Sequence, residues 1–132
     1  MAFPEQWAKG AIEAASGCQA FPLIAPEAYP LPYIVYGRNS TARESIMVGP
    51  RAVMVAPAAT FQVEIYAATY TEAKTLADFV RQALHNFNGQ AYGLTIRQCL
   101  LVEERDADPV FFDGQDKPTY SVEHTYQIRW EE

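Results

Sequence analysis

The sequence predicts an α+β fold, with a mainly antiparallel sheet of about four to five strands, two helices packed against it and a projecting β-hairpin. Two segments carry apolar residues at helical spacing, and several others favour extended backbone. Their order is helix, strand, hairpin, strand, helix, strand, strand, which is typical of α+β domains. At 132 residues the chain fits one domain, residues 1–132, with a hairpin insert at about 40–58.

The first predicted helix begins at Pro4, because proline suits the first helical turn, and ends near Gly17. Its apolar residues at helical spacing are Trp7, Ala8, Ala11, Ile12 and Ala15. A proline-rich connection follows, with Pro22, Pro26, Pro30 and Pro32. Each proline removes a backbone donor, so we do not expect a central strand there. The first strand is expected from Leu31 to about Arg38, where tyrosines and β-branched residues favour extended backbone.

Residues 37–45 are polar and predict a loop or a strand bend, and an apolar hairpin around Gly49-Pro50 comes next. The apolar residues of this hairpin are Ile46, Met47, Val48, Val53, Met54 and Val55. A two-stranded hairpin with such side chains is not stable alone in water. It has to fold back on the core or bury itself in a neighbouring molecule, and the sequence leaves both possibilities open.

The next strand begins near Thr60, with Phe61, Val63 and Ile65 on one face. The period then changes to that of a helix. Thr69 and Glu72 have the spacing of a capping box, in which hydroxyl and carboxylate each satisfy a free amide of the first turn. An apolar stripe follows, formed by Ala73, Leu76, Ala77, Val80, Ala83, Leu84 and Phe87, and Asn88-Gly89 is the predicted stop.

Two strands complete the predicted sheet. The first spans residues 94–104, and a turn-rich connection leads to the second, at 119–130, which alternates most clearly. One of its faces carries Tyr120, Val122, His124, Tyr126, Ile128 and Trp130. Twelve residues extend to roughly 40 Å, so we expect this strand to bend or to reach a partner beyond the core.

Charge and motifs argue against an enzyme or a nucleic-acid-wrapping protein. The formal net charge is −6, whereas wrapping needs clustered cations; an acidic surface that DNA slides past remains compatible. His85 and His124 have no nucleophile motif beside them. With Cys18 and Cys99 they also lack the short spacings of a zinc site, so we expect no metal and no cofactor. No apolar run is long enough to cross a bilayer and no signal peptide is visible, so no membrane partner is expected.

Two charged clusters are candidates for interaction surfaces. Arginines around the hairpin favour a protein interface over nucleic acid, because arginine is enriched at interfaces. The acidic cluster after residue 102 begins like a calcium loop but lacks its glycine and terminal glutamate, so we expect a solvated hairpin tip. The candidate subunit or partner interface comprises Arg38, Arg43, Ile46, Met47, Val48, Arg51, Val53, Met54, Val55, Glu104, Arg105, Asp106, Asp108 and Asp113.

Four pieces of the sequence come in a characteristic order. They are LPYIVYGR (31–38), FQVEIYAATYTEAKTLADFVRQAL (61–84), Glu104-Arg105-Asp106 followed by Asp113, and the C-terminal YQIRWEE. Over most of residues 20–132 the chain resembles the tail-completion, or tail-terminator, family of long-tailed bacteriophages. The junction of QVEIYA with the amphipathic helix contributes most to this resemblance.

The resemblance implies a structural, non-enzymatic virion protein in the tail or neck region, assembled in the host cytoplasm. Such proteins form a six-fold ring at the head-proximal end of the tail tube. The ring stops tube polymerisation and docks onto the head–tail connector or stopper protein, and DNA passes through its lumen without specific binding. The family brings no catalytic or cofactor residues. The insert at 40–58 is longer and more apolar than the family pattern, and it could reach a neighbouring subunit, the tube or the connector.

Two alternatives stay open. One is another neck or head-completion protein of a phage or a gene transfer agent. The other is a small ligand-binding or enzymatic α+β domain, with a pocket lined by Tyr33, Tyr36, Tyr66, Tyr120 and Tyr126. Filling the core is the more ordinary use of such tyrosines.

Overall fold

The structure is a computed structural model that describes residues 3–26, 29–42, 45–54, 57–91, 93–111 and 117–131. It contains two helices, α1 (Pro4–Ser16) and α2 (Tyr70–Leu84), and a six-stranded sheet in the order β1-β2-β5-β8-β7-β6. These strands are β1 (Ala20–Pro22), β2 (Tyr33–Ala42), β5 (Ala58–Ala67), β6 (Gly89–Ala91), β7 (Leu94–Asp106) and β8 (Tyr120–Glu131). A separate two-stranded sheet pairs β3 (Ser45–Val48) with β4 (Arg51–Met54).

The α+β class is correct, but the predicted sheet of four to five mainly antiparallel strands is wrong. The sheet has six strands and is mixed, because β1 runs parallel to β2 while all other neighbouring strands in the sheet pair antiparallel. The two strands that the sequence did not reveal, β1 and β6, have three residues each and lie at the two edges. Three residues are too few to show an alternating pattern, and an edge position tolerates the proline that ends β1.

Strand β2 is longer than predicted and continues through the polar segment to Ala42. It pairs antiparallel with β5 along its whole length, with a bulge between Arg38 and Ser40. The polar residues are compatible with a strand because Ser40 lies on the side of the sheet that carries no helix. Arg38 and Thr41 lie on the other side, where they bond to each other and Arg38 also bonds to Glu5.

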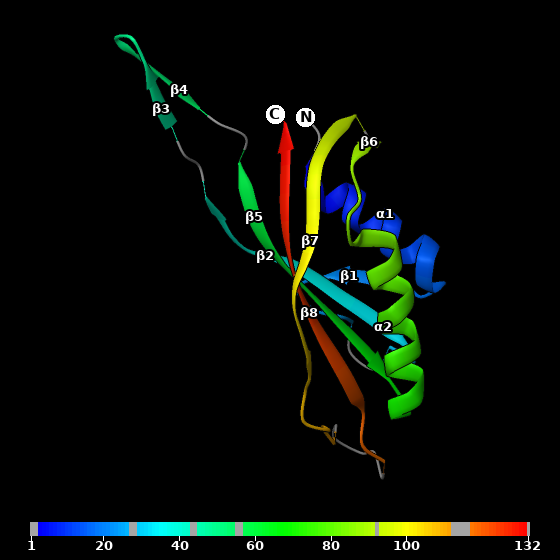
Figure 1. The fold of residues 1–132 in the computed structure, drawn as a ribbon. Coiled ribbons are helices and arrows are strands. Elements are labelled where there is room, and N and C mark those ends of the chain that lie inside the picture. Colours follow the sequence, from blue (N-terminus) through cyan, green and yellow to red (C-terminus); the bar gives the residue numbers. More distant parts are fainter. Residues whose placement is uncertain are drawn as a thin grey trace.

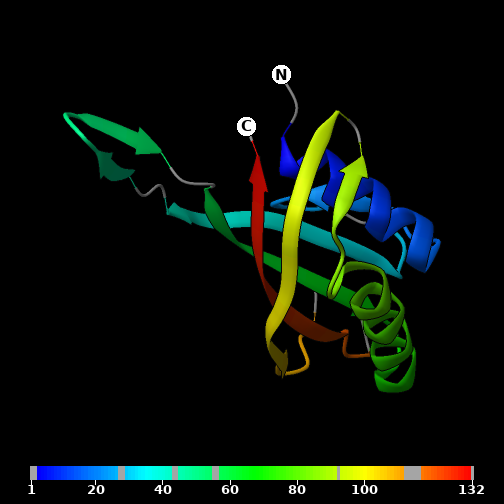
Figure 2. The same cartoon turned by 45° about the horizontal axis from the view of Figure 1, so that its top comes forward.

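The predicted hairpin is present. Strands β3 and β4 pair antiparallel from Ser45↔Met54 to Val48↔Arg51, around a turn in which Gly49 has a φ of 62°. A positive φ is accessible to glycine without steric cost, so this residue suits the turn. The hairpin projects away from the six-stranded sheet and both helices (Figures 1 and 2).

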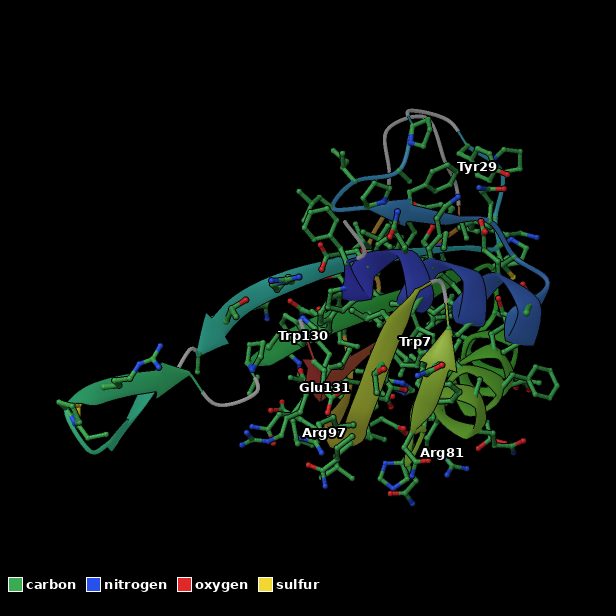
Figure 3. The ribbon with its side chains drawn as sticks, turned by 90° about the horizontal axis from the view of Figure 1, so that it is seen from above. Trp7, Tyr29, Arg81, Arg97, Trp130 and Glu131 are labelled. Atoms are coloured by element: carbon green, nitrogen blue, oxygen red, sulfur yellow. The ribbon has the colours of Figure 1, made fainter. Side chains whose placement is uncertain are left out.

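Both helices cover the same face of the sheet and enclose the core (Figure 1). The strand face predicted for β5, with Phe61, Val63 and Ile65, is buried there, and so is the α2 stripe with Ala77 and Val80. The alternation predicted for β8 is confirmed, because Val122, His124, Tyr126, Ile128 and Trp130 are all buried. Trp7 of α1 and Trp130 of β8 lie in this core between helix and sheet (Figure 3).

Helix α2 begins as predicted but ends earlier. Thr69 is the N-cap, and its hydroxyl accepts a hydrogen bond of 3.1 Å from the backbone N–H of Glu72. The predicted reciprocal bond from the Glu72 side chain is not among the hydrogen bonds of the described residues. The helix ends at Leu84, with His85 extended, because the chain turns there to pair β6 with β7 and the Asn86 amide donates to the carbonyl of Cys99.

The opposite face of the six-stranded sheet, called the open face below, carries neither helix. Its side chains are mostly polar. They include Ser40, Thr60, Gln62, Glu64, Tyr66, Glu123, Thr125, Gln127 and Arg129. The two faces of the sheet therefore differ in character, because the face under the helices is apolar and the open face is mostly polar.

Candidate interaction surfaces

The two charged clusters predicted from the sequence lie at opposite ends of the molecule. The hairpin projects from one end, whereas the C-terminal part of β7 and the residues after it lie at the other end (Figures 1 and 2). We call this second region, Val102–Phe111, the acidic end. Among the described residues, the predicted interface residues other than Arg38 fall into these two regions, which lie apart within one protomer.

The hairpin presents an exposed apolar side chain and an exposed cation near its turn, at register positions on opposite faces of the β3–β4 pair. Met47 is 69% exposed, and Arg51, Gly49 and Pro50 are exposed as well. Ile46, Val48, Val53 and Met54 are described by their strand positions alone, and the predicted residues Arg43 and Val55 lie outside the described residues. The hairpin turn is therefore an apolar and cationic surface held away from the core.

Arg38 is engaged inside its own protomer. Its Nε donates to Glu5 Oε1 of α1 at 3.1 Å, Nη2 pairs with the same carboxylate, and Nη1 donates to Thr41 Oγ1 at 3.0 Å. The guanidinium also lies 5.0 Å from the ring centroid of Trp130 and 5.7 Å from that of Phe61. These contacts join the β2 bulge to α1 and the core, so we assign Arg38 the role of positioning the strand that leads into the hairpin.

Part of the acidic end folds back onto α2. Lys74 Nζ lies 2.9 Å from Asp106 Oδ1 and 3.8 Å from Glu104 Oε1, and Tyr70 Oη donates to Asp106 Oδ2 at 2.5 Å. Hydrogen bonds from Tyr70 and Lys74 hold the pKa of the Asp106 carboxyl below its ordinary value. Arg105 pairs with Glu123 of β8. These pairs fix the C-terminal part of β7 against its own protomer.

The remaining charges and apolar side chains of the acidic end face solvent. Glu103 and Asp108 are exposed and have no ion pair among the residues that the structure describes; Asp113 lies outside them. Three apolar side chains accompany them: Val102 is 57% exposed, Val110 46% and Phe111 63%. Sequence reasoning missed these three, although the run Leu100-Leu101-Val102 breaks the alternation of β7 and so was a visible signal.

A second exposed apolar feature, also missed, lies beside β1. Leu23 and Ile24 are 76% and 79% exposed, and Leu23 has a φ of 66°. Its amide donates to the carbonyl of Tyr36 at 2.8 Å, and its side chain rests over Gly37, where a Cβ would come within 2.6 Å of Leu23 Cδ2. A leucine in the left-handed region is sterically costly, so the backbone bond to Tyr36 holds a strained turn in place.

The tyrosines considered for a pocket do not converge. Tyr36 and Tyr126 are buried on the helix side, whereas Tyr33 and Tyr66 stack on the open face with ring centroids 5.1 Å apart. Tyr66 Oη donates to Glu64 Oε2 at 2.5 Å. Their two separate locations favour structural roles.

The histidines and cysteines also have structural contacts. His85 Nδ1 accepts the Leu101 amide at 3.0 Å, and His124 is fully buried beside Glu104 and Tyr126. Burial raises the pKa of the Cys99 thiol to about 12, so this group stays protonated and unreactive near neutral pH. Within the described ranges, no three His, Cys, Asp or Glu side chains are grouped as metal ligands.

With this geometry established, comparison with known proteins decides the family. The family model of tail completion protein gp17 matches residues 8–131, nearly the whole chain. The chain belongs to the tail completion protein family. The resemblance seen in the sequence is thereby confirmed, and this tail completion protein is a structural component of a virion.

Solved structures share the fold of this tail completion protein. One chain of a structure described as the virion of a native gene transfer agent particle superposes with a TM-score of 0.61 at 12% identity, covering 98% of this chain and 90% of that one. Another solved structure gives a TM-score of 0.56 at 16% identity, covering 96% and 86%. No curated protein matches the sequence. Neither helix described in this tail completion protein is both long and apolar enough to span a membrane.

Proposed function

We propose that this tail completion protein forms a homo-hexameric ring that caps the head-proximal end of the tail tube. In this role the ring stops tube polymerisation and joins the tail to the head–tail connector or stopper protein. The family match over residues 8–131 carries the proposal, because tail completion requires a protein that meets a tube end.

Two features of the structure support a ring. The hairpin and the acidic end are different exposed surfaces at opposite ends of one protomer (Figure 1). Unlike surfaces generate head-to-tail contacts, and such contacts close into rings when the rotation between protomers allows it. The described interface residues proposed from the sequence come from these two regions, and Arg38 lies in the strand that leads into the hairpin.

DNA passes through the lumen of the proposed ring without specific binding. The net charge of −6 favours this, because acidic walls repel the phosphate backbone and prevent it from adhering. Such a ring would be located in the neck region of the virion.

The proposal is tested by adding the purified protein to polymerising tube protein from the same particle. We expect electron microscopy to show tubes with a ring at one end and a shortened length distribution. Tubes that grow unchanged and carry no ring, together with a strictly monomeric protein, would contradict the proposal.

A second candidate is another neck or head-completion protein of a phage or gene transfer agent. The fold shared with a chain of a gene transfer agent virion favours it. Binding to purified connectors in the absence of tubes would separate this role from that of a tube terminator.

A further inference from the structure

The hairpin has little cover within its own protomer. Among the described elements, β3 and β4 pack appreciably only on each other, and Met47 remains 69% exposed. An isolated two-stranded hairpin is at best marginally stable in water. Its apolar side therefore gains stability from contact with a surface outside the protomer.

The acidic end has complementary properties. It offers Val110 and Phe111 as exposed apolar side chains close in sequence to Asp108, and Val102 beside Glu103 further back along β7. The charges are opposite: residues 45–54 contain one arginine and no acidic residue, whereas residues 102–111 contain four acidic residues and one arginine. Complementary charges orient an encounter and suppress contacts between like surfaces.

The exposed pair Leu23-Ile24 fits the hairpin less well. The segment around it, residues 20–33, contains a single acidic residue and no basic one. It could supply apolar contact but little attraction for the hairpin arginine. Charge therefore selects the acidic end.

The geometry requires a second molecule. The hairpin points away from the acidic end of its own protomer (Figures 1 and 2). A symmetric hairpin-to-hairpin contact would place arginine against arginine, which costs free energy. A head-to-tail contact instead pairs opposite charges at each junction.

We propose that the hairpin of one copy docks onto the acidic end of the next copy, with Met47 against Val110 and Phe111, and with Arg51, on the other face of the hairpin, towards Asp108. This inference rests on the proposed ring and identifies the contact that closes it. The strand β2, held by Arg38, sets the direction in which the hairpin leaves each protomer.

The test uses two single variants, Met47→Asp and Phe111→Asp, and their mixture. Each variant keeps one surface intact, and both side chains are mostly exposed, so the monomers are expected to fold. Native mass spectrometry should show that each variant alone needs an at least about tenfold higher concentration to assemble than the wild type. An equimolar mixture should give a one-to-one dimer and nothing larger, because only one pair of intact surfaces is available per dimer.

Phe79→Asp is the matched control, since Phe79 is 45% exposed on α2 and lies outside both surfaces. It should assemble like the wild type. A double charge reversal, Arg51→Glu with Asp108→Arg in one chain, should restore the assembly that either reversal alone weakens.

The outcomes separate this inference from the proposed function. If the wild type forms rings and both single variants do too, or if the mixture yields no dimer, the hairpin does not dock on the acidic end, whereas the ring function stands. Rings of Met47→Asp that no longer bind tubes would assign the hairpin to the tube protein and overturn the inference. A wild type that assembles neither alone nor on tubes contradicts the ring itself.

Discussion

The Nε2 atom of His124 lies 3.0 Å from Glu104 Oε2. The His124 side chain is fully buried between the sheet and the helices. Despite this short distance, Nε2 has no hydrogen-bond partner among the described residues. Nδ1 lies 2.8 Å from Tyr126 Oη. Burial raises the pKa of Tyr126 far above its ordinary value, so its hydroxyl stays protonated and can donate to Nδ1. The imidazole is thus held neutral inside the fold.

We predict that the protein loses stability as the pH falls below 6.5. Burial lowers the pKa of His124 from 6.5, and Glu104 opposes this while Arg81 and Lys74 of α2 reinforce it. The unfolded chain then binds a proton at a higher pH than the folded chain. The contribution of His124 to the free energy of unfolding is therefore fully present above pH 6.5. It decreases as the pH falls from 6.5 towards the pKa of His124 in the folded state.

Thermal unfolding of two variants between pH 7 and pH 5 checks this prediction. His124→Gln should flatten the pH dependence, whatever its effect on absolute stability. Glu104→Gln should steepen it, because the carboxylate that favours the protonated imidazole is lost. An unchanged slope in His124→Gln would show that another group is responsible.

Arg38→Lys should lower the free energy of unfolding by about 1–2 kcal/mol. Lysine cannot reproduce the paired contacts to Glu5 and Thr41, and it loses the planar stacking near Trp130. Urea titration followed by tryptophan fluorescence measures the loss. Arg97→Lys is the control. Among the described residues Arg97 makes a single, solvent-exposed ion pair, 3.3 Å from Glu131 (Figure 3), so the change should alter stability by less than about 0.5 kcal/mol.

Leu23→Asn should raise the free energy of unfolding by up to about 1 kcal/mol. Asparagine tolerates the left-handed region, and little burial is lost at a side chain that is 76% exposed. Leu23→Val should lower it instead, since a β-branched residue is disfavoured at a φ of 66°. Equal midpoints for the two variants in urea would mean that the turn stores no strain.

Thr69→Ala should cost about 1 kcal/mol, because the first turn of α2 loses the hydroxyl that accepts the Glu72 amide. Thr69→Asn should retain most of that stability. Amide hydrogen exchange at Glu72 gives a local reading of the same loss. Unchanged exchange in Thr69→Ala would indicate that water replaces the hydroxyl at no cost.

The elements with many periods were predictable from sequence, as was the hairpin with its Gly-Pro turn, whereas the short edge strands were not. Strand β8 shows its alternation over twelve residues and α2 its stripe over four turns, so both were identified with the correct buried face. Strands β1 and β6 are defined by pairing with β2 and β7, which a local pattern cannot show. The length of β2 was missed because some of its polar residues lie on the open face, and Arg38 is paired with Glu5, a residue distant in sequence.

The candidate surfaces were also predictable only in part. Apolar residues in the hairpin and acids near residue 106 were visible as patterns. The internal contacts of Arg38, the exposure of Val102 and the strained turn at Leu23 depend on residues far apart in sequence. These features follow from the pairing of segments that are distant in sequence, and local sequence patterns do not show that pairing.

The position of β8 has a consequence for synthesis. It lies between β5 and β7, so both of these strands pair with residues made after them. Until residues 120–131 have emerged from the ribosome, β5 and β7 each lack a neighbouring strand, and the buried side chains of β8 are missing from the core. Folding with such non-local pairing is slow and occurs late relative to translation. Assembly-competent subunits are thus supplied only from chains translated through β8, and prematurely ended chains lack the central strand of the sheet.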